Sequence, residues 1–236
     1  RARIDPELHR TTVKRGGDVR PVRWERLQKA GVDKHVYRFD PDTFNPTIPI
    51  GGNLLFAAPT REISQQSLVS DGKFIHILHE QDVAATALEI SHGVVELLRQ
   101  TFGEDGTAHP LFLRLGIEPE TFARLSAIAA RRTEGGDEAL SDVERSTMIT
   151  VAFLLSAEQI GEGFPDAFKA RILDIRKTRA PQLRKIVKDM FVEVKPDTYF
   201  PRLTVAENAL YGRVSMFAGA DADKIENLIS EVMEEH

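Results

Sequence analysis

The stretch "PDTYFPRLTVAENALYGR" (196–213) repeats a phrase that occurs earlier in the chain, "PDTFNPTIPIGGNLLF" (41–56). Aligned without gaps from Pro41 and Pro196, the two segments are identical at six of sixteen positions and similar in shape at four more. In both segments two prolines fix an extended or turned backbone, and a short helix is predicted to follow. A generic proline turn that recurs by chance is the alternative, but the matched rare residues favour a true repeat.

The two copies differ in how that short helix begins. In the second copy, Thr204 can cap the helix and Glu207 stands three positions later, which is the pattern of a capping box. In the first copy, Pro49 takes the place of the threonine and Gly51–Gly52 take the place of Ala206–Glu207. The first copy therefore lacks the cap chemistry, and we expect it to persist as structure and contact surface more than as chemistry.

Composition restricts the class of protein. The chain has 236 residues, 42% apolar and 28% charged, with a net charge of -5 and a pI near 5.9. These values are typical of a soluble globular protein and argue against nucleic acid as the main partner. The absence of cysteine excludes disulfides, thiolate catalysis and cysteine-based metal sites. The basic run "RKTRAPQLRK" (176–185) is predicted to form a solvated helix face.

Apolar periodicity predicts a mainly α protein, bundle-like, with at most a few short strands. A capping box at Ser141 and Glu144 marks one helix start, another is expected at Thr60, and "HVYRFD" (35–40) could form a strand. Helices are predicted over 24–31, 74–102, 118–132, 141–158, 165–179, 181–191 and 221–236. No βαβ alternation is visible, which argues against a complete α/β nucleotide-binding domain.

The phrase "RLTVAENALYGR" resembles the segment just after the Q-loop of ATP-binding cassette (ABC) transporter ATPases, where the chain enters the helical subdomain. The residues that carry this resemblance are Thr204, Val205, Ala206, Glu207, Asn208, Leu210, Tyr211 and Gly212. On this basis we expect an N-terminal arm and short helix at 1–34, a first, degenerate helical subdomain at 35–156, a helical linker at 157–195 and the start of a second copy at 196–236.

A second motif stands where the family carries its "LSGGQ" signature. The matching stretch reads "LSDVE" and consists of Leu140, Ser141, Asp142, Val143 and Glu144, of which only the first two match. The family's glycines let backbone N–H groups approach a phosphate, whereas two carboxylates at this helix start would repel one. We therefore expect poor support for ATP hydrolysis; an ordinary capped core helix is the alternative. The phosphate-binding loop "GxxxxGK[ST]" is absent from the chain.

The resemblance implies a helical regulatory or coupling region of an ABC-type transporter ATP-binding protein, with no catalytic residue of its own. It would relay nucleotide state to a membrane-spanning partner or to a second ATPase half. ATP and magnesium are expected for the parent protein and no cofactor for this chain, which we take to be an excised piece. The implied location is cytoplasmic, peripheral to the inner face of the membrane, without direct insertion. The implied partner contacts are Pro196, Tyr199, Pro201, Thr204, Glu207, Asn208 and Tyr211.

Two other functions stay open at this point. The chain could be a stand-alone helical interaction module in which the repeat is only a packing device. It could also be a small metal-binding enzyme that uses His76 and His79, with Glu80 and Asp82 nearby, because two imidazoles three positions apart share a helix face. The spacing does not match "HExxH", and a half-buried helix with hydrogen-bonded histidines is the favoured interpretation.

Overall fold

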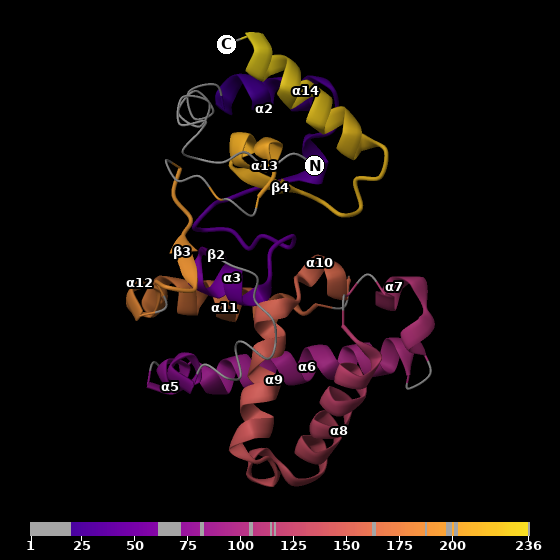
Figure 1. Cartoon of the computed structure of the whole chain (residues 1–236), viewed down its shortest axis with the longest axis vertical. Helices are drawn as coiled ribbons and strands as arrows, with labels where there is room; N and C mark the ends of the chain where they lie inside the picture. The colour runs from indigo at the N-terminus through magenta and orange to yellow at the C-terminus, as the bar shows by residue number, and fades with distance from the viewer. Residues whose placement is uncertain are drawn as a thin grey trace.

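Helices dominate the chain, which confirms the prediction of a mainly α fold (Figure 1). The structure is a computed structural model that describes residues 20–60, 72–80, 83–103, 106–113, 115, 117–161, 164–186, 188–196, 200 and 203–235. The arm predicted at the N-terminus lies largely outside the described residues, as do Asp82, Tyr199 and Pro201. No helix in the described ranges is long and apolar enough to cross a bilayer.

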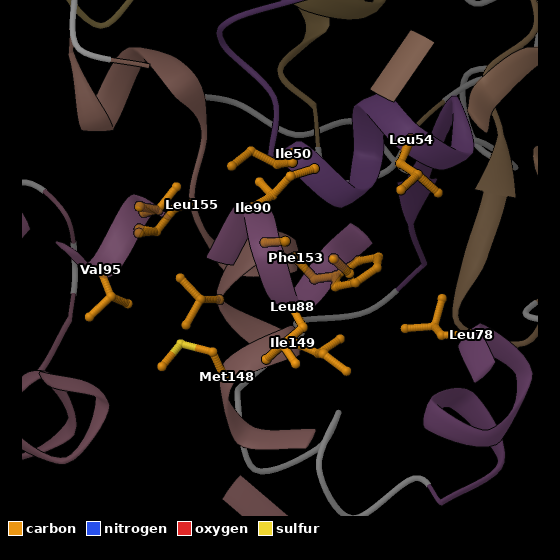
Figure 2. Close-up of a cluster of buried hydrophobic side chains, with 14 of the residues drawn as sticks. Ile50, Leu54, Leu78, Leu88, Ile90, Val95, Met148, Ile149, Phe153 and Leu155 are labelled. Atoms are coloured by element: carbon orange, nitrogen blue, oxygen red, sulfur yellow. The ribbon is translucent and has the colours of Figure 1, made fainter. Parts of the chain in front are cut away.

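The largest core forms where α6 (Ala84–Phe102) packs across α9 (Asp142–Leu154). Figure 2 shows Ile90 of α6 and Ile149 and Phe153 of α9 converging beneath Ile50. Around this pair lie α5 (Gly72–Glu80), α7 (Pro110–Leu113), α8 (Pro119–Gly135), α10 (Ala157–Ile160) and α11 (Asp166–Thr178). In the described part of the chain, three short 3-10 turns connect helices and strands: Asp33–His35, Gly106–Ala108 and Asp137–Ala139.

Two long predicted helices are each divided in the structure. The helix predicted over 74–102 breaks between α5 and α6, because Val83 is fully buried and its N–H bonds the carbonyl of Leu78 (2.8 Å), which closes a turn. The helix predicted over 141–158 ends at Leu154, since Leu155 is extended, and Ser156 then caps α10. The apolar period continues across both breaks because Val83 at the first and Leu155 at the second are buried in the core.

The strands are three residues long each, and only the first coincides with a predicted strand. They are β1 (Val36–Arg38), β2 (Ala57–Pro59), β3 (Phe191–Glu193) and β4 (Gly212–Val214). The helix start expected at Thr60 stays a prediction, because residues 61–71 lie outside the described residues; Thr60 itself directly follows β2, and its N–H donates to the carbonyl of Met190 (2.8 Å). The helix predicted over 181–191 is α12 (Ala180–Ile186), and its last predicted residue already belongs to β3.

The strands flank the two copies of the repeat and pair across them. β1 lies antiparallel to β4, with Val36 opposite Val214, and β2 lies antiparallel to β3, with Pro59 opposite Phe191. The two sets of pairs are equivalent: adding 155 to the number of a β1 residue and subtracting 155 from its β4 partner gives a β3–β2 pair, so that Val36 and Val214 correspond to Phe191 and Pro59. The strand before each copy therefore pairs with the strand after the other copy; we call this arrangement the exchange of halves.

The helices around the strands follow the same exchange. α2 (Arg20–Lys29), which precedes the first copy, packs against α13 (Val205–Leu210) of the second copy and α14 (Asp221–Glu235) after it. Conversely, α12 contacts α3 (Ile50–Leu55) and α5. Figure 1 shows the result as a terminal unit (α2, β1, α13, β4, α14) above a central unit (α3, β2, α5 to α12, β3). These contacts join helices on opposite sides of residues 195 and 196, where the boundary between the helical linker and the second repeat was predicted.

Candidate functional site

The predicted site phrase is held in shape by the side chain of Asn208. Its carboxamide oxygen accepts a hydrogen bond from the N–H of Phe200 (2.7 Å), eight residues upstream. Its NH2 group donates to the carbonyls of Phe200 (2.9 Å), Leu203 (3.3 Å) and Thr204 (3.0 Å). One amide thus fastens the proline-flanked loop to the helix that follows.

The capping box predicted for the second copy is present. The Thr204 hydroxyl accepts from the N–H of Glu207 (3.2 Å), and the Glu207 carboxylate accepts from the N–H of Thr204 (2.9 Å). The other carboxylate oxygen accepts from Nε of Arg213 (3.1 Å), so the buried Glu207 is both a cap and an ion-pair partner. The start of α13 is therefore held by two reciprocal cap bonds and an ion pair.

The remaining predicted contact residues point in different directions. Tyr211 adopts a left-handed backbone (φ 50°), and its ring packs edge-on against Phe39, just before the first copy (5.4 Å between centroids). Its carbonyl accepts from the N–H of Phe39 (2.8 Å). Pro196 is exposed and lies three residues after the end of β3. The partner contacts predicted for these residues stay predictions, but the Tyr211 ring is engaged inside the molecule.

The first copy repeats this geometry in the interior. Asn53 is fully buried and accepts from the N–H of Asn45 (2.8 Å) while it donates to the carbonyls of Asn45 (2.7 Å) and Ile48 (3.3 Å). Phe56 has the same left-handed backbone as its counterpart (φ 48°). All six residues of α3 are buried. The expectation that this copy offers a contact surface is therefore wrong for the helix.

The missing cap of the first copy has a packing explanation. Pro49 makes no side-chain cap, as predicted, and the Ile50 N–H instead donates to the Leu155 carbonyl (2.9 Å) at the end of α9. A Cβ at Gly51 would lie 1.9 Å from the ring of Phe153, so glycine is what lets α9 approach α3. Figure 2 shows the ring of Phe153 beside α3. Gly51 thus serves close helix packing.

Arg176 is a structural residue that sequence reasoning missed, because its basic run was expected to be solvated. It is buried, and its guanidinium donates to the carbonyls of Asn53 (2.6 Å), Pro41 (2.9 Å) and Thr43 (2.8 Å). Burial lowers the pKa of Arg176 to about 10, against the opposing effect of the Asp40 carboxylate. No sequence signal distinguishes it from the exposed Lys177 beside it. The loop of the first copy is thus fastened by an arginine as well as by an asparagine.

A cavity of about 520 Å³ lies where the second copy faces the central unit. We call it the inter-unit groove. It is lined by Thr204, Ala206 and Glu207 of the second copy; Arg213, Val214, Ser215 and Met216 of and after β4; Ala222 and Glu226 of α14; Thr47 and Pro49 of the first copy; and Leu154, Ser156, Glu158 and Gln159 around the start of α10. Thr204 and Glu207, both predicted contact residues, therefore form part of one wall.

The lining of the inter-unit groove is charged and its edge is apolar. Three carboxylates, of Glu158, Glu207 and Glu226, and one guanidinium, of Arg213, face it. The Ser215 hydroxyl donates to the Glu158 carboxylate, and this bond joins β4 to α10 across the two units. Met216 (41% exposed) and Phe217 (55% exposed) follow directly after these residues. The groove can thus offer both acidic and apolar contacts.

The signature-like stretch lies away from this groove. Ser141 caps α9 through the predicted capping box with Glu144, whereas Leu154 of the groove is at the other end of the helix, about 20 Å along its axis. The backbone N–H of Ser141, then its hydroxyl and the Arg131 guanidinium, lower the pKa of Glu144. Leu140 is buried, while Asp142 and Val143 are exposed. The structure therefore places the two predicted motifs at separate sites.

The histidine pair lies on α5. His76 and His79 are both exposed, whereas Ile75 and Leu78 of the same helix are buried, so the favoured interpretation of a half-buried helix is confirmed. Nε2 of His76 lies 3.8 Å from a carboxylate oxygen of Glu80. Among the described residues, no three His, Asp or Glu side chains are grouped so that they could hold a metal ion.

The chain matches no protein-family model, and no curated protein or solved structure shows significant similarity to it.

Proposed function

We propose that this chain is a coupling region of an ABC-type ATPase, without catalysis of its own, and that the inter-unit groove docks a segment of a partner. The observation that carries the proposal is that Thr204, Ala206 and Glu207 line one wall of the groove. These residues belong to the phrase that resembles the segment after the Q-loop, and in that family the segment lies near the coupling helices of the membrane-spanning partner.

The shape of the phrase supports this role. The capping box and the Asn208 carboxamide hold the loop and α13 in one geometry, so the groove wall needs little reorganisation on binding. The Met216 and Phe217 side chains are among the few large apolar groups exposed in the described residues, and exposed apolar groups beside a groove are typical of protein contacts. The proposal assigns ATP and magnesium to the parent protein and places the chain at the inner face of the membrane through its partner.

Site-specific photo-crosslinking in cells tests the proposal. The full-length protein that carries this chain would be expressed with a photoreactive amino acid at Met216, beside the groove, or at Val143, which is 68% exposed at the first turn of α9. The expected result is a crosslinked product from position 216, and not from 143, that stays in the membrane after carbonate extraction.

Two outcomes would overturn the proposal. A product from position 216 that contains only water-extractable proteins would favour a stand-alone interaction module instead. Equal crosslinking from positions 216 and 143, or no product from either, would show that the groove is not a preferred contact site.

A further inference from the structure

The exchange of halves leaves the two copies with one difference that points to a binding mode. A shift of 155 positions places Ala206 of α13 where Gly51 stands in α3. In the first copy this face of the helix is covered by another part of the chain. In the second copy the same face lines the inter-unit groove.

The covering segment of the first copy is the end of α9 with the start of α10. Phe153 lies over Gly51, the Leu155 carbonyl accepts from the Ile50 N–H (2.9 Å), and Ser156 forms an antiparallel bridge with Pro49. Further on, the N–H of Glu158 donates to the carbonyl of Pro46 (2.9 Å). A helix end followed by an extended residue thus seals the first turn of α3.

From this internal example we infer that the inter-unit groove binds the C-terminal end of a partner helix and the extended residue after it, laid across α13 as α9 and α10 are laid across α3. The inference rests on the proposed docking function and adds the form of the docked segment. The groove has the room for it, since about 520 Å³ is of the order of several side chains.

The lining of the groove specifies the chemistry of the docked segment. Ala206 carries a Cβ where Gly51 has none, and an aromatic ring placed as closely as Phe153 would collide with it. The segment therefore presents a small or aliphatic side chain at that point. Three lining carboxylates against one guanidinium, that of Arg213, favour a segment with positive charge.

A peptide made from the chain's own covering segment provides the probe. Residues 145–159, "RSTMITVAFLLSAEQ", with Phe153→Ala and Glu158→Lys in the peptide, would carry a fluorophore and be titrated with the whole chain by fluorescence anisotropy. We expect saturable binding. The peptide with Phe153 retained should bind about tenfold more weakly. The whole-chain variant Ala206→Gly should restore the binding of that second peptide.

Two tryptophan variants, each placed in a cavity of similar size, serve as the test and its control. Ala206→Trp fills the inter-unit groove and should abolish binding, whereas Ala123→Trp fills a cavity of about 540 Å³ on α8 and should leave binding unchanged. Equal loss in both variants, or no binding of either peptide to the unaltered chain, would overturn the inferred binding mode. Failure of Ala206→Gly to rescue the Phe153 peptide would overturn the equivalence with Gly51.

The coupling role and the inferred binding mode can be overturned independently of each other. Peptide binding without a membrane-embedded crosslink from Met216 would keep the binding mode and reject the coupling role. A membrane-embedded crosslink that Ala206→Trp abolishes, without peptide binding, would keep the coupling role and reject the helix-end segment as the ligand.

Discussion

Asn53 and Asn208, 155 positions apart, make the same hydrogen bonds with backbone groups eight, five and four residues upstream. The two carboxamides stand at the same point of two loops that cross between the terminal and the central unit. They differ in surroundings, because the first is fully buried and also accepts from the Arg176 guanidinium (3.1 Å). The repeat is thus a repeat of hydrogen-bonding geometry as well as of sequence.

Removal of the two carboxamides should cost different amounts of stability. Asn53→Ala leaves the buried N–H of Asn45 and one donor of Arg176 without an acceptor, so we expect a loss of about 3 kcal/mol in the free energy of unfolding. Asn208→Ala removes a half-buried group and should cost about 1.5 kcal/mol. Urea denaturation followed by circular dichroism measures both. Asn227→Ala, exposed on α14, is the control and should change stability little.

Gly51→Ala should destabilise the fold by about 2 kcal/mol, because its Cβ would overlap the Phe153 ring in a closely packed core. Gly93→Ala in α6 is the matched control: its Cβ would meet only the outer ring atoms of Phe168, a half-buried side chain that can shift. The same urea titration compares the two. Equal costs would mean that the contact between α3 and α9 is not the reason for the glycine.

The sequence predicted those features that depend on local chemistry. The repeat, the mainly α fold and the capping boxes at Ser141 and Thr204 all follow from spacing and residue type, and the structure confirms them. Most of the strands were not predicted from the sequence, since a run of three residues is too short to show a period of two. Even with the strands known, local sequence does not state that β1 pairs with β4, because this choice is made by contacts between distant segments.

In the candidate site too, some residues could be predicted from local sequence and others depend on contacts between distant segments. Thr204 and Glu207 were found through their cap pattern, and they line the inter-unit groove. The opposite wall, with Glu158 of α10, comes from a segment whose position depends on how α9 packs on α3. The burial of Arg176 is likewise a tertiary outcome in a run that reads as solvated.

The Glu144 carboxylate should make stability depend on pH. Its pKa is lowered in the folded chain, chiefly by the hydrogen bond from the Ser141 N–H, so below the ordinary value of 4.5 the unfolded state takes up more protons than the folded state. The stability that this group contributes is therefore present above pH 4.5 and is lost as the pH falls through the folded pKa.

The variant Glu144→Gln should remove that dependence. It should be less stable than the unaltered chain at pH 6, and the difference should shrink at pH 3, as measured by urea midpoints at the two pH values. Glu138→Gln, which removes an exposed carboxylate that caps no helix, is the control. A difference for Glu144→Gln that stays constant with pH would contradict the role of the charge.

The exchange of halves can be tested by a designed disulfide, since the chain contains no cysteine. Val36 of β1 lies opposite Val214 of β4, and directly opposed Cβ atoms in antiparallel strands are about 4.5–5.5 Å apart. We expect the double variant Val36→Cys with Val214→Cys to form an intramolecular disulfide under mild oxidation, and to unfold at a higher temperature when oxidised than when reduced. Pro59 is the counterpart of Val214 in the first copy, so Val36→Cys with Pro59→Cys tests the pairing without exchange. Gel mobility without reductant separates the cases: a disulfide in the 36–59 pair and none in the 36–214 pair would show that each copy closes on itself.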